Sequence, residues 1–139
     1  MTHAGGCYCG DIRYEIAAEP TGARTCWCRD CQYIASGSGT NNVLFPEDSV
    51  SFDGEITEIE RTADSGNKLR RGFCPLCGTH LYSRTVEPKG FPIRIRSGTL
   101  DDTELIAPGE VIFTASAPSW AIIDPNLPQH QKAPPPEGN

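Results

Sequence analysis

The sequence lacks any long hydrophobic run. No window of the 139 residues approaches the roughly 18 apolar residues that a membrane-spanning helix requires. The first ten residues, MTHAGGCYCG, contain neither the basic nor the apolar segment of a secretory signal peptide. These absences predict a soluble protein with no membrane partner, and we expect a cytoplasmic location.

An excess of positive charge is also missing. The chain has 12 Lys and Arg residues against 18 Asp and Glu residues, a formal net charge of -6. Such a chain has no general attraction to phosphate backbones, so nucleic acid is excluded as the primary partner. The length suits one domain. We expect this domain to span 1–130 and the proline-rich segment 131–139 to be a disordered tail.

Sustained helical periodicity is absent too. Instead, short apolar stretches recur about every 8 to 12 residues, and residues 10–17 place Ile12, Tyr14 and Ile16 on one face of a strand. Further strands are expected at 42–45, 49–52, 57–62, 81–85 and 93–96, with one helical turn at 100–105. The sequence therefore predicts a mainly β, single small domain with short helical turns.

Cysteine, in contrast, is abundant and grouped. The seven cysteines form a CxC, a CxCxxC and a CxxC cluster: Cys7 and Cys9; Cys26, Cys28 and Cys31; Cys74 and Cys77. An odd number leaves one thiol over in any complete disulfide scheme. Disulfides are also rare in the cytosol. The grouping therefore favours metal binding.

The first and last clusters look like two halves of one site. An extended CYC segment would point Cys7 and Cys9 to the same side. In FCPLCG, Cys74 and Cys77 flank a tight turn that Pro75 favours. Together these four cysteines predict a closed, structural zinc site. The alternatives are another metal, such as iron, or reduced thiols.

The middle cluster has three thiols and no fourth cysteine left to join them. Three protein ligands with one open position are typical of a catalytic zinc, so Cys26, Cys28 and Cys31 are the candidate catalytic residues. Two alternatives stay open: a zinc completed by a ligand other than cysteine, and free or redox-active thiols.

These motifs together resemble one known family. The segments GGCYCGDIRYEI at 5–16, CWCRDC at 26–31, RGFCPLCGTHLYS at 71–83, GTLDD at 98–102 and SW at 119–120 are similar to the glutathione-dependent formaldehyde-activating enzymes. That family includes centromere protein V. The resemblance covers about residues 5 to 128 and implies the zinc-containing scaffold called the β-tent.

The resemblance also implies roles for the cysteines. It assigns a structural zinc to Cys7, Cys9, Cys74 and Cys77, and a second zinc, with ligation that changes with substrate, to Cys26, Cys28 and Cys31. The implied activity is that of a carbon–sulfur lyase acting on formaldehyde, or another aldehyde, and a thiol such as glutathione. The alternatives are a non-catalytic zinc-binding scaffold module and a thiol redox sensor that uses the CxCxxC cluster.

Two departures from the family bear on the substrate. Trp27 stands where many members carry a polar residue, often His, and we expect it to pack over the site or to stack against a flat substrate. The chain is also shorter than the glutathione-dependent enzymes, which leaves open whether glutathione is recognised. Oligomeric state is not indicated by the sequence.

Several polar residues are further candidates. His80 is either a ligand or base near a zinc site, or a surface residue. Arg29 and Asp30 either orient a ligand or are solvated. The arginines of IRIR and of the segment before the knuckle either bind the carboxylates of a glutathione-like ligand or form a solvated face; they are Arg94, Arg96, Arg70 and Arg71.

Two late motifs are expected to be structural. Asp101 and Asp102 are interpreted as turn or cap residues. Trp120 is expected in the core, closing the late strands.

Overall fold

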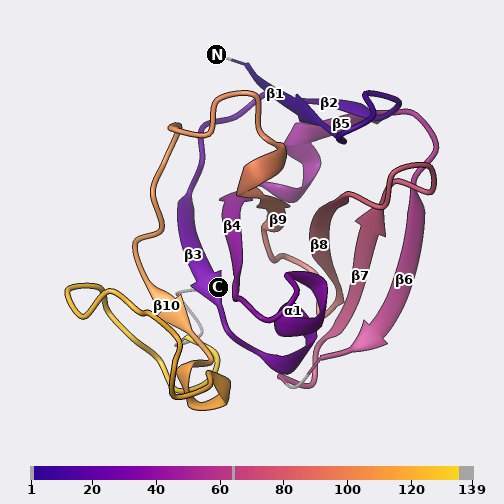
Figure 1. The fold of residues 1–139 in the computed structure, drawn as a ribbon. Helices are drawn as coiled ribbons and strands as arrows, with labels where there is room; N and C mark the ends of the chain where they lie inside the picture. The colour runs from indigo at the N-terminus through magenta and orange to yellow at the C-terminus, as the bar shows by residue number, and fades with distance from the viewer. Residues whose placement is uncertain (1, 64, 135–139) are drawn as a thin grey trace.

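The structure is a computed structural model that describes residues 2–63 and 65–134. It is built from short strands and a few short helices, in the order shown in Figure 1. The strands are β1 (His3–Gly6), β2 (Arg13–Ile16), β3 (Gly22–Cys26), β4 (Thr40–Phe45), β5 (Val50–Asp53), β6 (Thr57–Thr62), β7 (Lys68–Phe73), β8 (His80–Glu87), β9 (Ile93–Arg96) and β10 (Val111–Ile112). The helices are α1 (Arg29–Ile34) and the 3-10 turns η1 (Glu47–Ser49), η2 (Ser97–Thr99) and η3 (Thr114–Ser116).

The strands form two sheets. The smaller sheet has the order β1-β2-β5, and the larger has the order β10-β3-β4-β9-β8-β7-β6. Among the described pairs of named strands, β10–β3 is parallel and the others are antiparallel. An isolated bridge between Val111 and Gln129 is also parallel. Figure 1 shows β3, β4, β9, β8, β7 and β6 following one another across the molecule, with α1 beside their ends. The predicted mainly β fold class with short helices is confirmed.

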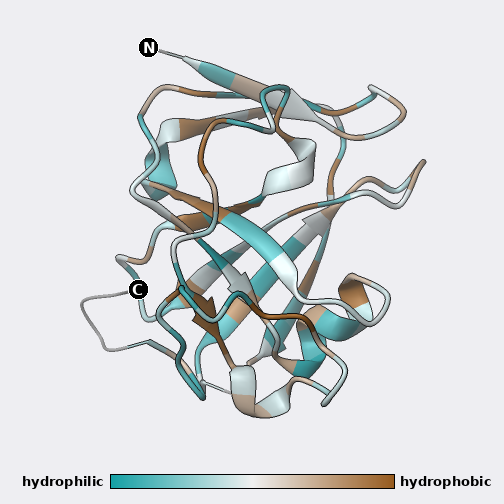
Figure 2. Cartoon of the chain, turned by 60° about the vertical axis from the view of Figure 1, so that its left-hand side comes forward, coloured by the Kyte–Doolittle hydropathy of each residue, from teal (hydrophilic) through white to brown (hydrophobic). Residues whose placement is uncertain are grey.

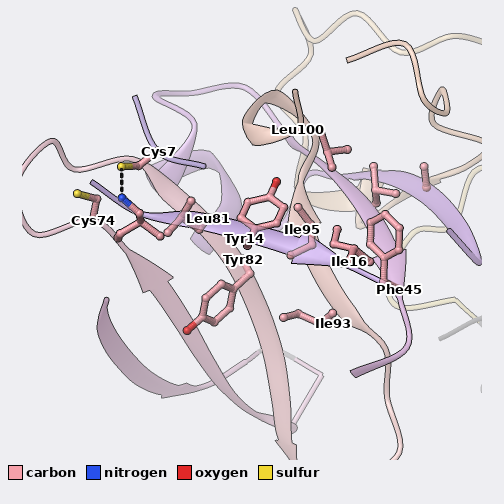
Figure 3. Close-up of a cluster of buried hydrophobic side chains, with 13 residues drawn as sticks. Cys7, Tyr14, Ile16, Phe45, Cys74, Leu81, Tyr82, Ile93, Ile95 and Leu100 are labelled. Atoms are coloured by element: carbon pink, nitrogen blue, oxygen red, sulfur yellow. Dashed lines mark hydrogen bonds between the residues drawn. The ribbon is translucent and has the colours of Figure 1, made fainter. Parts of the chain in front are cut away.

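The core lies between the two sheets. Tyr14 and Ile16 project from β2, while Phe45, Ile93 and Ile95 project from β4 and β9, and each is at most 1% exposed. Figure 3 shows these side chains grouped together, with Cys7 and Cys74 at one end of the cluster. The alternation predicted for residues 10–17 is confirmed, because Arg13 and Glu15 on the opposite face of β2 are exposed.

Alternation also explains the colouring of the strands. In Figure 2 many strands change between hydrophilic and hydrophobic colours along their length. In β9, Ile93 and Ile95 face the core, so Arg94 and Arg96 must face the other side of the large sheet. That second face carries the candidate site.

Three local predictions are wrong. Residues 100–105 form no helix; instead the Asp102 carboxylate accepts a hydrogen bond from the Glu104 N–H at 3.0 Å, which closes a turn. Trp120 is 70% exposed and not in the core. The CYC segment is a turn and not extended, because the Gly10 N–H donates to the Cys7 carbonyl at 3.1 Å.

The end of the chain is described as far as residue 134. The expected disordered tail falls mainly on residues 135–139, which lie outside the described residues. Before them, the Phe113 N–H donates to the Lys132 carbonyl at 3.1 Å. Within residues 2–63 and 65–134, none of the helices has the length and apolar character needed to span a bilayer.

Candidate active site

The first and last cysteine clusters meet in one place. The Sγ atoms of Cys7, Cys9, Cys74 and Cys77 all lie within 4.8 Å of one another. The Cys7 and Cys9 sulfurs are 3.6 Å apart, and those of Cys9 and Cys74 are 3.8 Å apart. Sixty-five positions separate Cys9 from Cys74, so the cluster joins two distant parts of the chain.

The two loops that supply these four cysteines contain the same kind of turn. Each is a tight turn that ends in a glycine with a positive φ, +83° at Gly10 and +78° at Gly78. A residue with a Cβ rarely adopts this conformation, which explains the C-x-C-G and C-x-x-C-G patterns. The Ile12 N–H also donates to the Cys7 sulfur at 3.2 Å, the contact drawn as a dashed line in Figure 3. Backbone donors and turns therefore preset the sulfurs as a group.

The middle cysteine cluster converges at the start of α1. Cys26 ends β3, Cys28 is the N-cap of α1 and Cys31 lies within the helix; their sulfurs are within 4.8 Å of one another. The Cys31 N–H donates to the Cys28 sulfur at 3.4 Å, and the Thr40 hydroxyl donates to the Cys31 sulfur at 3.0 Å. All three cysteines are buried and none forms a disulfide.

The contacts within this three-thiol cluster separate the pKa values of its members. Hydrogen bonds with Cys26 and Cys28 lower the pKa of Cys31, and the charge of Arg96 and the Thr40 hydroxyl add to the effect. The contacts with Cys28 and Cys31, together with burial, raise the pKa of Cys26. One thiol of the cluster therefore ionises far more easily than another.

Each cluster can hold a metal ion. Four convergent thiols fit a closed tetrahedral zinc site, and three fit a site that leaves one position for another ligand. Thiol sulfur favours soft or borderline metals such as zinc over magnesium or calcium. The four-thiol cluster and the three-thiol cluster are therefore two separate candidate metal sites.

A cavity opens beside the three-thiol cluster. It has a volume of about 360 Å³ and is lined by Cys26, Cys28 and Cys31. Phe91, Phe113 and Ile112 add apolar surface. A cavity of this size is typical of a site for a small molecule.

Four buried arginines line the same cavity, on the face of the large sheet opposite the core. Paired residues of neighbouring antiparallel strands project to the same face, and here they form successive rows. The rows are Cys26 and Thr40; then Arg24, Asn42 and Arg96; then Arg94, Ser83 and Arg71. The three-thiol cluster therefore lies at one end of a strip of guanidinium groups.

The arginines differ in their partners. Arg71 and Arg24 have carboxylate partners, Asp30 at 3.4 Å and Glu110 at 3.5 Å. Among the described residues, Arg94 and Arg96 have no ion-pair partner. Burial, followed by the charges of Arg24 and Arg96, lowers the pKa of Arg94 to about 9.

The hydrogen bonds of these two arginines leave donors unused. Arg94 Nε donates to the Ser83 hydroxyl at 3.2 Å and its Nη1 donates to the Pro92 carbonyl at 2.9 Å. Arg96 Nη1 donates to Thr40 and Asn42. Arg96 Nε and Nη2 are buried without a hydrogen-bond partner among the described residues.

The interpretation of Arg94 and Arg96 as a solvated strand face is wrong, because each is 8% exposed. Arg70 does belong to an exposed face, where its Nε pairs with Glu60 at 3.1 Å. Of the four arginines named from the sequence, three line the cavity: Arg71, Arg94 and Arg96. Arg24 was not singled out, because the pairing of β3 with β4 that places it is not visible in local spacing.

The remaining candidates lie around the site in other roles. Asp30 accepts from Arg61 and Arg71, and Arg29 stacks over the Tyr33 ring at 5.0 Å. Trp27 is buried, and its carbonyl accepts from the Gln32 side chain at 2.8 Å; its side chain is not part of the described cavity lining.

His80 belongs to neither thiol cluster. Its ring packs against Phe73 with 5.5 Å between ring centres. The ring Nδ1 is buried without a partner among the described residues. Burial, followed by the charges of Arg96 and Arg71, lowers the pKa of His80. A neutral imidazole is therefore favoured at this position.

Asn42, Thr40 and Ser83 were missed by sequence reasoning. Each is a common polar residue without a motif of its own. Their importance follows from the strand register that places them beside the arginines and thiols.

Comparisons with known proteins identify a family and a protein of similar fold. The family model described as glutathione-dependent formaldehyde-activating enzyme matches residues 2–116. The crystal structure of a Rhodobacter sphaeroides protein is similar in fold, with a TM-score of 0.56 and 15% sequence identity. That similarity covers 76% of this chain and 91% of the other. No curated protein matches the chain.

Proposed function

The chain belongs to the family of glutathione-dependent formaldehyde-activating enzymes, and from that premise we propose that it is a zinc-dependent carbon–sulfur lyase. Its substrates are an aldehyde, such as formaldehyde, and a small-molecule thiol, such as glutathione. The observation that carries this proposal is the cavity of about 360 Å³ onto which Cys26, Cys28 and Cys31 open. The four-thiol cluster contributes none of the described residues of that cavity.

The two cysteine clusters have different tasks in this proposal. Cys7, Cys9, Cys74 and Cys77 hold a structural zinc, because four protein sulfurs complete its coordination. Cys26, Cys28 and Cys31 hold a second zinc and form the catalytic centre, because three sulfurs leave one position for substrate. Zinc bound there supplies a Lewis acid and stabilises thiolate near neutral pH.

The reaction adds a thiol across a carbonyl group. The sulfur of the substrate thiol bonds to the aldehyde carbon, and the carbonyl oxygen takes up the proton, which gives an S-hydroxymethyl adduct when the aldehyde is formaldehyde. The reverse direction breaks the same carbon–sulfur bond. The chain's own residues hold the three-thiol cluster in place for this reaction: Thr40 orients Cys31, and Gln32 ties α1 to the Ser116 carbonyl at 3.0 Å.

Exchange NMR tests this activity directly. We expect the protein to accelerate exchange between formaldehyde, glutathione and their adduct, and Cys28→Ser to abolish the acceleration. Tyr33→Ser, at a residue of the same helix that is 79% exposed, is the control and should keep it. The absence of acceleration with several thiols and aldehydes would contradict the proposal and favour a scaffold module.

Metal content gives a second test. Native mass spectrometry under reducing conditions should find two zinc ions in each folded chain. One zinc would leave the three thiols as redox groups or as a site filled only with substrate.

All seven cysteines are free of disulfides, which supports a cytoplasmic location.

A further inference from the structure

We propose that the cavity beside the three-thiol cluster binds a small acid without an ammonium group, and that Arg94 and Arg96 hold its carboxylate or phosphate oxyanion. This inference rests on the proposed function in one respect: it takes the thiol end of the cavity as the place of reaction. Binding of the oxyanion does not depend on that activity. Because the acid would lie next to this place of reaction, we take it to be one of the two substrates or a part of one.

The first support is unbalanced buried charge. Arg94 and Arg96 are each 8% exposed, and neither has an ion-pair partner among the described residues. Arg96 keeps two buried nitrogens, Nε and Nη2, without a hydrogen bond, and the Nε of Arg71 is in the same state. Buried guanidinium groups without an anion are strongly unfavourable. An oxyanion supplies both the missing charge and the missing acceptors.

The second support is the position of these donors relative to the thiols. Arg96 donates to the Thr40 hydroxyl at 3.4 Å, and that hydroxyl donates to the Cys31 sulfur at 3.0 Å. A single hydroxyl thus separates the first guanidinium from the three-thiol cluster. Arg94 is two residues further along β9, about 7 Å away at the usual rise of a strand. A small molecule can reach both the arginines and the sulfurs.

The third support is the absence of acidic side chains from the described lining of the cavity. Apart from the three thiols, its charged lining residues are arginines, namely Arg24, Arg71, Arg94 and Arg96. An amino acid would place its ammonium group among these guanidinium groups, and the described lining contains no carboxylate to receive it. Acids that lack an ammonium group avoid this repulsion, which selects against zwitterions.

Arginine side-chain NMR provides a direct measurement on the zinc-loaded protein. The Nε–Hε signals of Arg71 and Arg96 report on donors that have no partner. Titration uses succinate and inorganic phosphate as probes, which separates a carboxylate site from a phosphate site. Aspartate, which is succinate with an added ammonium group, and the neutral diamide succinamide are the matched comparison ligands. We expect saturable shifts with succinate or phosphate, and at least about tenfold weaker binding of aspartate and succinamide.

Two substitutions remove the same charge from opposite faces of the large sheet. Arg94→Gln should weaken binding of the preferred probe by roughly 10- to 100-fold, the usual consequence of losing a hydrogen bond to a charged group. Arg70→Gln is the control, because Arg70 is exposed and pairs with Glu60 away from the cavity. It should leave the affinity within about twofold. Arg94→Met should fold with an unfolding temperature no lower than that of the parent protein, because it removes an unpaired buried charge.

Each outcome of these binding and stability measurements supports or overturns a stated part of the proposal. Equal weakening in Arg94→Gln and Arg70→Gln, or no saturable shift with either probe, would overturn the oxyanion site. Aspartate binding at least as tightly as succinate and phosphate would overturn the assignment to an acid without an ammonium group. Marked destabilisation of Arg94→Met would assign Arg94 to the fold instead. Retained probe binding with no exchange between any of several aldehydes and thiols would refute the proposed reaction and leave the oxyanion site standing.

Discussion

The Thr40 hydroxyl donates a hydrogen bond to the Cys31 sulfur at 3.0 Å, and the two residues come from different elements, β4 and α1. The bond orients the sulfur and lowers the pKa of Cys31, which favours the thiolate form that would bind a metal. Arg96 in turn donates to Thr40, so the sheet and the helix are linked through this hydroxyl.

Removing this hydroxyl should weaken metal binding at the three-thiol site. Thr40→Val keeps the shape of the side chain but loses the donor, and losses of this type reduce metal affinity by roughly 10- to 100-fold. Competition with a chromophoric zinc chelator measures the effect. Thr40→Ser restores the donor and should keep the parent affinity. If Thr40→Val binds zinc as tightly as Thr40→Ser, the hydrogen bond has no role at the metal site.

The two cysteine clusters should differ in their effect on folding. Zinc-finger peptides gain about 10 to 16 kcal/mol from their metal. This matches the entire stability of a typical domain, about 5 to 15 kcal/mol. Because Cys74 is fully buried in the core and joins distant loops, Cys74→Ser should prevent folding. Cys28→Ser should remain folded. Circular dichroism and thermal unfolding compare them, and similar unfolding temperatures would argue against a structural role for the four-thiol cluster.

Truncation of a core isoleucine of β9 should be costly. Ile95 is fully buried, so Ile95→Ala should lower the free energy of unfolding by about 2 to 5 kcal/mol. Ile122 is 96% exposed, and Ile122→Ala should change it by no more than about 0.5 kcal/mol. Urea titration followed by fluorescence gives both values. A comparable loss in both variants would mean that the core does not depend on β9 as described.

Two strand glycines should respond differently to alanine. A Cβ on Gly72 of β7 would overlap the end of the Tyr82 side chain, so Gly72→Ala should cost about 1 to 3 kcal/mol of stability. A Cβ on Gly22 of β3 meets no described atom within 4 Å, and Gly22→Ala should be nearly neutral. Urea unfolding of the two variants side by side tests the close packing of Tyr82 on β7. Equal stability would show that this contact relaxes freely.

Local patterns were sufficient for part of the fold. The strands at 57–62 and 93–96 were predicted with the bounds that the structure gives them, and the inward face of β2 was read from alternation. The CYC segment was misread as extended, because two sulfurs also converge when a short turn folds back on itself. Trp120 was placed in the core on hydrophobicity alone, although the chain leaves it 70% exposed.

The candidate site was predictable where neighbouring residues build it. Cys26, Cys28 and Cys31 are close in sequence, and a helix start brings i and i+3 together, so their convergence follows from spacing. The arginines are a different case. Alternation within IRIR predicts that Arg94 and Arg96 share a face of the strand. It does not predict whether that face contacts solvent or a cavity.

The sequence by itself determined the division of seven cysteines into three clusters, the short alternating strands and the turns that end in Gly10 and Gly78. These features depend on interactions between residues a few positions apart. Only the tertiary structure decided that Arg24, Arg71, Arg94 and Arg96 line one cavity with the three thiols. The pairing of β3, β4, β9, β8 and β7 brings them together, and strand register between distant segments depends on packing of the whole domain.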